Sequence, residues 1–148
     1  MSAPELSVTR HIAAPPAKVW DVMVNRMAEW WCPKPWTTDI EALDRFAGGR
    51  WNFTMRGPNG EVHANRGTLL AWDEGRRFAG TDAVVGDLQP AKPFMIGIWE
   101  LAPEGDGTLY TATARHWSEE DRDQHKEMGF EDGWKVCADQ LAELCEGP

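Results

Sequence analysis

The sequence predicts an α+β fold for the whole chain, residues 1–148, in which a curved antiparallel sheet wraps around a long C-terminal helix. Segments with alternating apolar residues recur along the chain and predict about six or seven strands. Two short helical segments follow the first strand, and the C-terminal segment has one apolar face at helical spacing. No repeat or linker divides the chain, so we expect one domain.

The chain begins with a strand and two short helices. Residues 5–13 alternate in polarity, with apolar side chains from Leu6 to Ile12 on one side. Pro16 suits the first turn of a helix, and the apolar residues after it repeat at helical spacing. Residues 27–31 form a second short helix, which the following prolines end.

Further strands are expected at residues 38–43, 50–55, 61–72, 76–81, 94–101 and 108–116. Turn residues separate these segments, and Asn59-Gly60 is the strongest hairpin signal among them. Gly67 interrupts a long strand and predicts a bulge or bend that curves the sheet. Residues 82–92 have no periodicity and are expected to form a loop.

The C-terminal segment predicts an amphipathic helix that covers the sheet. Ser118 begins it, and the acidic residues that follow are favourable at the positive end of a helix. Gly129 and Gly133 each cost about 1 kcal/mol relative to Ala inside a helix. We therefore expect a break near residue 129, giving helices over 118–128 and 130–146. The apolar face consists of Phe130, Trp134, Cys137, Leu141 and Leu144.

The charge of the chain limits its partners. A net charge of −9 argues against a nucleic-acid partner, because phosphate binding needs a basic surface. The same acidity disfavours binding to an anionic membrane. The N-terminal residues show no basic segment followed by an apolar run, and no stretch approaches the ~18 apolar residues of a membrane span. We therefore expect a soluble cytoplasmic protein that binds neither nucleic acid nor membrane.

The cysteines indicate reduced thiols. There are three, Cys32, Cys137 and Cys145, and the last two fall on one predicted helix, roughly 12 Å apart along its axis, too far for a disulfide. No cysteine or histidine cluster has zinc spacing, and the common hydrolase, nucleotide and metalloprotease motifs are missing. We expect no metal and no cofactor.

The nine tryptophans are more than a solid core of this size needs. Because pockets favour rigid aromatic side chains, we expect some of them to line a cavity between the sheet and the C-terminal helix. Ala112 and Ala114 leave space in a core-facing row, and His116 ends that row beside the predicted pocket. The expected ligand-binding residues are Trp51, Phe53, Met55, Trp99, Tyr110, Ala112, His116, Met128, Phe130 and Trp134.

Four motifs in order resemble a known family. They are WWCP at residues 30–33, GGRW at 48–51, MRGPNG at 55–60 and HKEMGFEDGW at 125–134, with DQL following at 139–141. They resemble proteins homologous to the C-terminal domain of the heat-shock-protein-90 ATPase activator, a group within the START-like (SRPBCC) superfamily, which also holds the birch-pollen-allergen fold and the polyketide cyclases.

The resemblance extends from Arg10 to Leu144 and implies a helix-grip fold. Cys32 stands where the family usually has Gly, and Trp36 stands where Phe is common. Members of the superfamily bind lipids, hormones or polyketides, and a minority are enzymes. The resemblance therefore implies a pocket more directly than it implies a reaction.

Three functions remain open from the sequence. The first is binding of a small hydrophobic or aromatic ligand in the cavity, without identified chemistry. The second is a cofactor-free enzyme of polyketide-cyclase type, with His116 and Tyr110 as the candidate catalytic groups. We favour binding, because the sequence shows no fixed pairing of a histidine with a group that orients it. His63 and His125 are expected at the surface or at the pocket rim.

The third function is an interaction module that forms a homodimer or associates with a chaperone. Phe94, Ile96 and Ile98 lie on the strand face opposite Trp99. If that face points outward, these three residues form an apolar patch suited to dimerisation.

Overall fold

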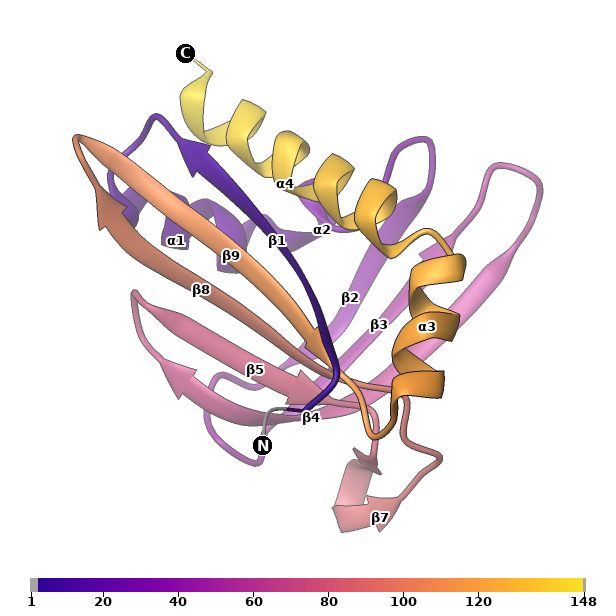
Figure 1. The fold of residues 1–148 in the computed structure, drawn as a ribbon. Helices are drawn as coiled ribbons and strands as arrows, with labels where there is room; N and C mark the ends of the chain where they lie inside the picture. Colours follow the sequence, from indigo (N-terminus) through magenta and orange to yellow (C-terminus); the bar gives the residue numbers. More distant parts are fainter. Residues whose placement is uncertain (1–2, 148) are drawn as a thin grey trace.

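The computed structural model describes residues 3–147 and has a seven-stranded antiparallel sheet in the order β1-β9-β8-β5-β4-β3-β2. The first and second strands of the chain therefore form the two edges (Figure 1). This arrangement confirms the predicted α+β fold. The strands are β1 (Glu5–Ile12), β2 (Thr37–Leu43), β3 (Arg50–Arg56), β4 (Val62–Asp73), β5 (Arg77–Thr81), β8 (Ile96–Glu104) and β9 (Gly107–Arg115).

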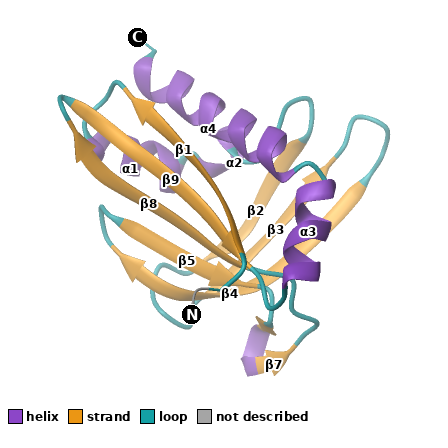
Figure 2. Ribbon diagram, in the orientation of Figure 1, coloured by secondary structure: helices purple, strands orange, loops and turns teal. Residues whose placement is uncertain are grey.

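Three helices pack on the inner face of this sheet. They are α1 (Pro16–Asn25), α2 (Met27–Trp30) and the long C-terminal α4 (Phe130–Glu146). Helix α4 contacts β1, α1 and α2, so the curved sheet and the two short helices hold it along its length (Figures 1 and 2). The helix-grip arrangement implied by the resemblance is confirmed.

A break separates α4 from the preceding helix α3 (Glu119–Glu127), as the sequence predicts. Gly129 lies between them with a φ of 96°, a left-handed conformation that glycine adopts without steric cost. At the start of α3, the Ser118 hydroxyl accepts a hydrogen bond from the Asp121 backbone N–H at 3.1 Å. The break turns α3 away from the axis of α4, toward one end of the sheet.

Two local predictions differ from the structure. The pairing of β3 with β4 runs unbroken through Gly67, and the irregularity in β4 lies between Leu69 and Ala71, against β5. Gly67 instead allows a close approach, because a β-carbon there would lie 2.6 Å from the Thr81 carbonyl oxygen. The expected loop contains a small ribbon of β6 (Val84–Val85) and β7 (Gln89–Pro90), too short to show any periodicity.

Phe94, Ile96 and Ile98, which would form an apolar patch if their strand face pointed outward, do not lie together on one strand. Ile98 is buried, and Phe94 precedes β8 and turns toward the helices, with its ring centroid 4.7 Å from that of His125. Two backbone N–H groups, those of Phe94 and Met95, donate to a carboxylate oxygen of Asp82 at 2.9 and 3.3 Å. This anchor holds the segment against the inner side of the fold. Within residues 3–147, no helix has the length and apolar character needed to cross a membrane.

Candidate ligand-binding site

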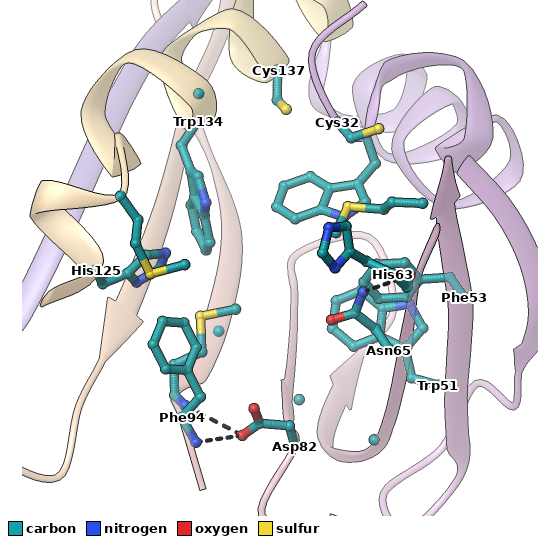
Figure 3. A pocket seen from close by; sticks show the side chains of 18 of the residues that line it. Cys32, Trp51, Phe53, His63, Asn65, Asp82, Phe94, His125, Trp134 and Cys137 are labelled. Atoms are coloured by element: carbon teal, nitrogen blue, oxygen red, sulfur yellow. Dashed lines mark hydrogen bonds between the residues drawn. The ribbon is translucent and has the colours of Figure 1, made fainter. Parts of the chain in front are cut away.

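A pocket of about 860 Å³ lies between the inner face of β3, β4, β5 and β8, the loop after α2, and the junction of α3 with α4. This volume falls within the ~300–1,000 Å³ typical of small-molecule sites. Figure 3 shows Trp51 and Phe53 on the sheet side of the pocket and His125 and Trp134 on the helix side. Its aromatic and sulfur-bearing lining consists of Trp31, Cys32, Trp36, Trp51, Phe53, Met55, His63, Phe94, Met95, Trp99, His125, Met128, Trp134 and Cys137.

Four indole rings pack against one another around the pocket. Trp99 and Trp134 are stacked, with ring centroids 5.5 Å apart and planes 16° apart. Trp31 meets both rings edge-on, at 5.4 Å from Trp99 and 5.3 Å from Trp134. Trp51 also meets Trp99 edge-on, at 5.1 Å. These offset and perpendicular arrangements are the favourable ones for aromatic pairs, so the wall is rigid.

Two strand glycines make room for these rings on the sheet. A β-carbon on Gly80 would lie 2.6 Å from the Trp51 ring, and one on Gly97 would lie 2.6 Å from the Trp99 ring. Any other residue at either position would push the indole away from the sheet and into the pocket. The glycines therefore determine where the pocket wall stands.

The indole N–H groups of Trp31, Trp51 and Trp99 are buried and donate to no acceptor within residues 3–147. Buried polar groups are normally hydrogen-bonded, and an unpaired one costs about 1–3 kcal/mol. Three such donors around one pocket are therefore a notable concentration. The tryptophans thus supply apolar surface to the pocket, and their unpaired indole N–H groups lower the stability of the fold.

Gln140 of α4 fastens the loop that carries Trp31. Its side-chain N–H group donates to the carbonyl oxygens of Trp30 at 2.9 Å and Cys32 at 3.0 Å, while its oxygen accepts from the Lys34 backbone N–H at 3.0 Å. Cys32 has a φ of 66°, a left-handed conformation that favours glycine. One glutamine thus fixes the loop that closes this side of the pocket.

Polar side chains gather on the β4 side of the pocket. His63 stacks on Trp36, with ring centroids 5.7 Å apart, and both line the pocket. Arg66 also borders it, but its guanidinium donates to the Glu41 carboxylate at 2.7 Å. This ion pair satisfies the arginine charge outside the cavity, so the pocket offers no free cation from Arg66.

Two buried histidines pair at the helix-side wall, where His125 lines the pocket and His116 lies behind it. Nε2 of His116 lies 2.9 Å from Nδ1 of His125, and the backbone N–H of His116 donates to the Pro4 carbonyl at 2.8 Å. Burial, and to a smaller extent the neighbouring His116, lower the pKa of His125 to about 4. His125 is therefore neutral at pH 7. It lines the pocket and is only 7% exposed, whereas the sequence places it at the surface or rim.

The thiols are buried and protonated. All three cysteines are free, and burial raises the pKa of Cys137 to about 12 and that of Cys145 to about 11. Across the described part of the chain, no group of three or more His, Cys, Asp or Glu side chains is placed to hold a metal ion.

The structure separates the ten expected ligand-binding residues into two groups. Trp51, Phe53, Met55, Trp99, Met128 and Trp134 line the pocket, whereas Tyr110, Ala112, His116 and Phe130 lie outside its lining.

The residues outside the lining belong to the packed core or stand one layer behind the wall. Tyr110 is fully buried and meets Trp30 edge-on at 6.3 Å, and burial raises the pKa of its hydroxyl well above 10. Ala112 pairs with Trp99 across the β8–β9 ladder and is fully buried, so no cavity remains beside it. Phe130 packs on His125 with ring centroids 5.0 Å apart.

The predicted lining omits Trp31, Trp36 and Phe94. His63 and His125, which the sequence places at the surface or at the pocket rim, also border the pocket. Trp31 and Trp36 follow short helices and prolines, where no periodicity assigns a face.

Comparisons with known proteins identify the family. The family model described as "Activator of Hsp90 ATPase homolog 1-like protein" matches residues 13–146. A solved protein of Nitrosomonas europaea is 35% identical, with a TM-score of 0.90 over 97% of this chain and 96% of that one. Among proteins with curated functions, none matches.

More distant structures share the fold. A protein of Mycobacterium smegmatis is 24% identical, with a TM-score of 0.82 over 99% of this chain and 93% of that one. A protein of Silicibacter pomeroyi that carries the family name is 17% identical, with a TM-score of 0.69 over 95% of this chain and 96% of that one. The match over residues 13–146 shows that this chain belongs to the family of proteins like activator of Hsp90 ATPase homolog 1.

Proposed function

We propose that this protein binds a small, largely apolar aromatic molecule in the tryptophan-lined pocket. The observation that carries the proposal is a space of about 860 Å³ bordered by four indoles, three of which pack against the fourth, Trp99. Rigid aromatic walls with a few polar groups are typical of small-molecule sites. An aromatic ligand would extend the edge-on and stacked contacts that the indoles already make with one another.

A glycine in α4 supports the same proposal. Gly133 lines the pocket, and a β-carbon there would meet only Pro33, at 3.9 Å. Alanine would fit this helix position and favour the helix by about 1 kcal/mol. The chain keeps open space at a position where filling it would stabilise the protein, a pattern expected where function and stability compete.

The proposal includes no catalytic step. Tyr110 and His116, the catalytic candidates from the sequence, both lie outside the pocket lining. A general acid or base must come within hydrogen-bond reach of the substrate, and neither residue borders the space in which a substrate would sit.

Titration with 1-anilinonaphthalene-8-sulfonate, whose emission rises in apolar surroundings, tests the proposal. We expect saturable binding of about one equivalent that Met55→Ala weakens severalfold, because Met55 lines the pocket and is only half-buried. Trp117→Ala is the matched control, since Trp117 is 51% exposed and outside the lining. Binding that does not saturate, or that both variants change equally, would contradict the proposal.

A further inference from the structure

The paired histidines determine which hydrogen-bonding group the pocket wall presents. Nδ1 of His116 lies 3.3 Å from the Pro4 carbonyl oxygen, which can only accept a hydrogen bond. The proton of neutral His116 therefore resides on Nδ1, and its Nε2 carries a lone pair. Nε2 of His116 then accepts from Nδ1 of His125, 2.9 Å away. Because the single proton of neutral His125 is on Nδ1, its Nε2 also carries a lone pair.

The surroundings of the pair favour its neutral form. His116 and His125 are 3% and 7% exposed, and no carboxylate within residues 3–147 forms an ion pair with either ring. Aromatic rings surround His125, with centroids at 4.7 Å for Phe94, 5.0 Å for Phe130 and 6.0 Å for Trp134. A buried positive charge without a counter-charge is costly, and the lowered pKa of His125, about 4, leaves its imidazole uncharged at neutral pH.

The unprotonated Nε2 of His125 is part of a residue that lines the pocket. His125 lines the cavity, and Figure 3 shows its ring on the helix side between Trp134 and Phe94. Nδ1 is occupied by His116, while Nε2 makes no hydrogen bond within residues 3–147. The wall here therefore offers a lone pair in otherwise apolar surroundings, where a hydrogen bond is stronger than in water.

We propose that His125 Nε2 accepts a hydrogen bond from the ligand, so that the pocket selects an aromatic molecule with a hydroxyl group over the same molecule without a donor. His116 is a positioning residue that acts through His125, because its bond to Nδ1 fixes the tautomer. This inference rests on the proposed ligand-binding function and adds the chemical class of ligand.

Matched probes test the selection. The affinities of 2-naphthol and 2-methoxynaphthalene are compared by calorimetry, because methylation removes the donor and keeps the aromatic rings. We expect the wild-type protein to prefer the naphthol by about five- to tenfold, the effect of one buried hydrogen bond. In His125→Phe the ratio falls to about one, and in His116→Phe it falls between these values. His11→Gln, at an exposed histidine that pairs with Glu104, keeps the wild-type ratio.

The outcomes separate the two proposals. If both probes bind the wild-type protein equally, the pocket function stands and the role of His125 is overturned. If neither binds, the proposed function itself is contradicted for this ligand class. The imidazole ¹⁵N chemical shifts then decide the role of His116 without any ligand. We expect the proton on Nδ1 in both rings, with that of His125 distributed over both nitrogens in His116→Phe; a proton on Nε2 of His125 in the wild-type protein would overturn the inference.

Discussion

A β-carbon placed on Gly97 would lie 2.6 Å from the six-membered ring of Trp99, two residues along the same strand. The glycine thus lets the indole fold back over its own strand, where it stacks on Phe78 at 5.1 Å and on Trp134 at 5.5 Å. Trp99 is the residue that joins the sheet side of the aromatic wall to the helix side. Its position therefore controls the shape of the whole pocket.

Gly97→Ala is expected to destabilise the protein by about 1–3 kcal/mol, because the methyl group forces the buried Trp99 ring out of its place. Alanine in a strand is otherwise more stable than glycine, so a loss of stability would indicate the steric clash with Trp99. The free energy of unfolding in urea measures it. Gly86→Ala is the control, since a β-carbon there meets nothing within 4 Å. Equal stability of both variants would show that the ring moves without cost.

Gln140→Leu is expected to loosen the loop that carries Trp31. The substitution removes three hydrogen bonds, to Trp30, Cys32 and Lys34, and leaves buried carbonyl groups without donors. We expect a loss of about 2–3 kcal/mol in unfolding free energy and a weaker near-ultraviolet circular dichroism signal from the tryptophans. Unchanged dichroism would mean that the four indoles hold the loop without Gln140.

Acid is expected to destabilise the protein through His125. Its pKa of about 4 in the folded state lies below the ordinary value of 6.5, so the unfolded chain takes up a proton first as the pH falls. The contribution to stability is complete above pH 6.5 and is lost between there and pH 4, to a total of about 3 kcal/mol.

The comparison of wild type with His125→Phe isolates this effect from the titration of carboxylates. Urea unfolding at several pH values from 7 to 4 should show the wild-type protein losing about 3 kcal/mol more than the variant. Parallel pH profiles would indicate that His125 becomes charged in the folded state without penalty.

Gly133→Ala is expected to raise the unfolding free energy by about 1 kcal/mol, because alanine favours the helix and its methyl group meets only Pro33 at 3.9 Å. Thermal unfolding measures the gain. A loss of stability would show that α4 needs the glycine for close packing rather than for open space.

The fold follows from local patterns that the sequence displays directly. The alternation of Trp51, Phe53 and Met55 identifies the inward face of β3. The glycine at position 129, inside an apolar helical pattern, predicts the break between α3 and α4. Such features depend on neighbours a few residues away. The resemblance to a family adds the helix-grip arrangement of the sheet and the C-terminal helix.

The pocket is harder to predict from the sequence than the fold. Periodicity predicts on which face of the sheet a side chain lies, but not which residues pack against it. Tyr110, Ala112 and Trp99 all lie on the inner face of the sheet, yet only Trp99 borders the pocket. Tyr110 packs against Trp30 of α2, and both Tyr110 and Ala112 are fully buried. The pairing of His116 with His125 joins the end of β9 to α3, and its orientation depends on the carbonyl of Pro4 at the opposite end of the chain. No spacing in the sequence reveals such a contact.

The most direct test of the central claim fills the pocket from a position that tolerates a larger side chain. Gly133→Leu projects a side chain from α4 into the cavity, and Val136→Leu adds the same residue at an exposed position of the same helix. Calorimetric titration with 2-naphthol should give the same affinity for wild type and Val136→Leu, and at least a tenfold loss for Gly133→Leu with an unchanged or higher melting temperature. Equal affinity in all three proteins would place the ligand elsewhere and contradict the account.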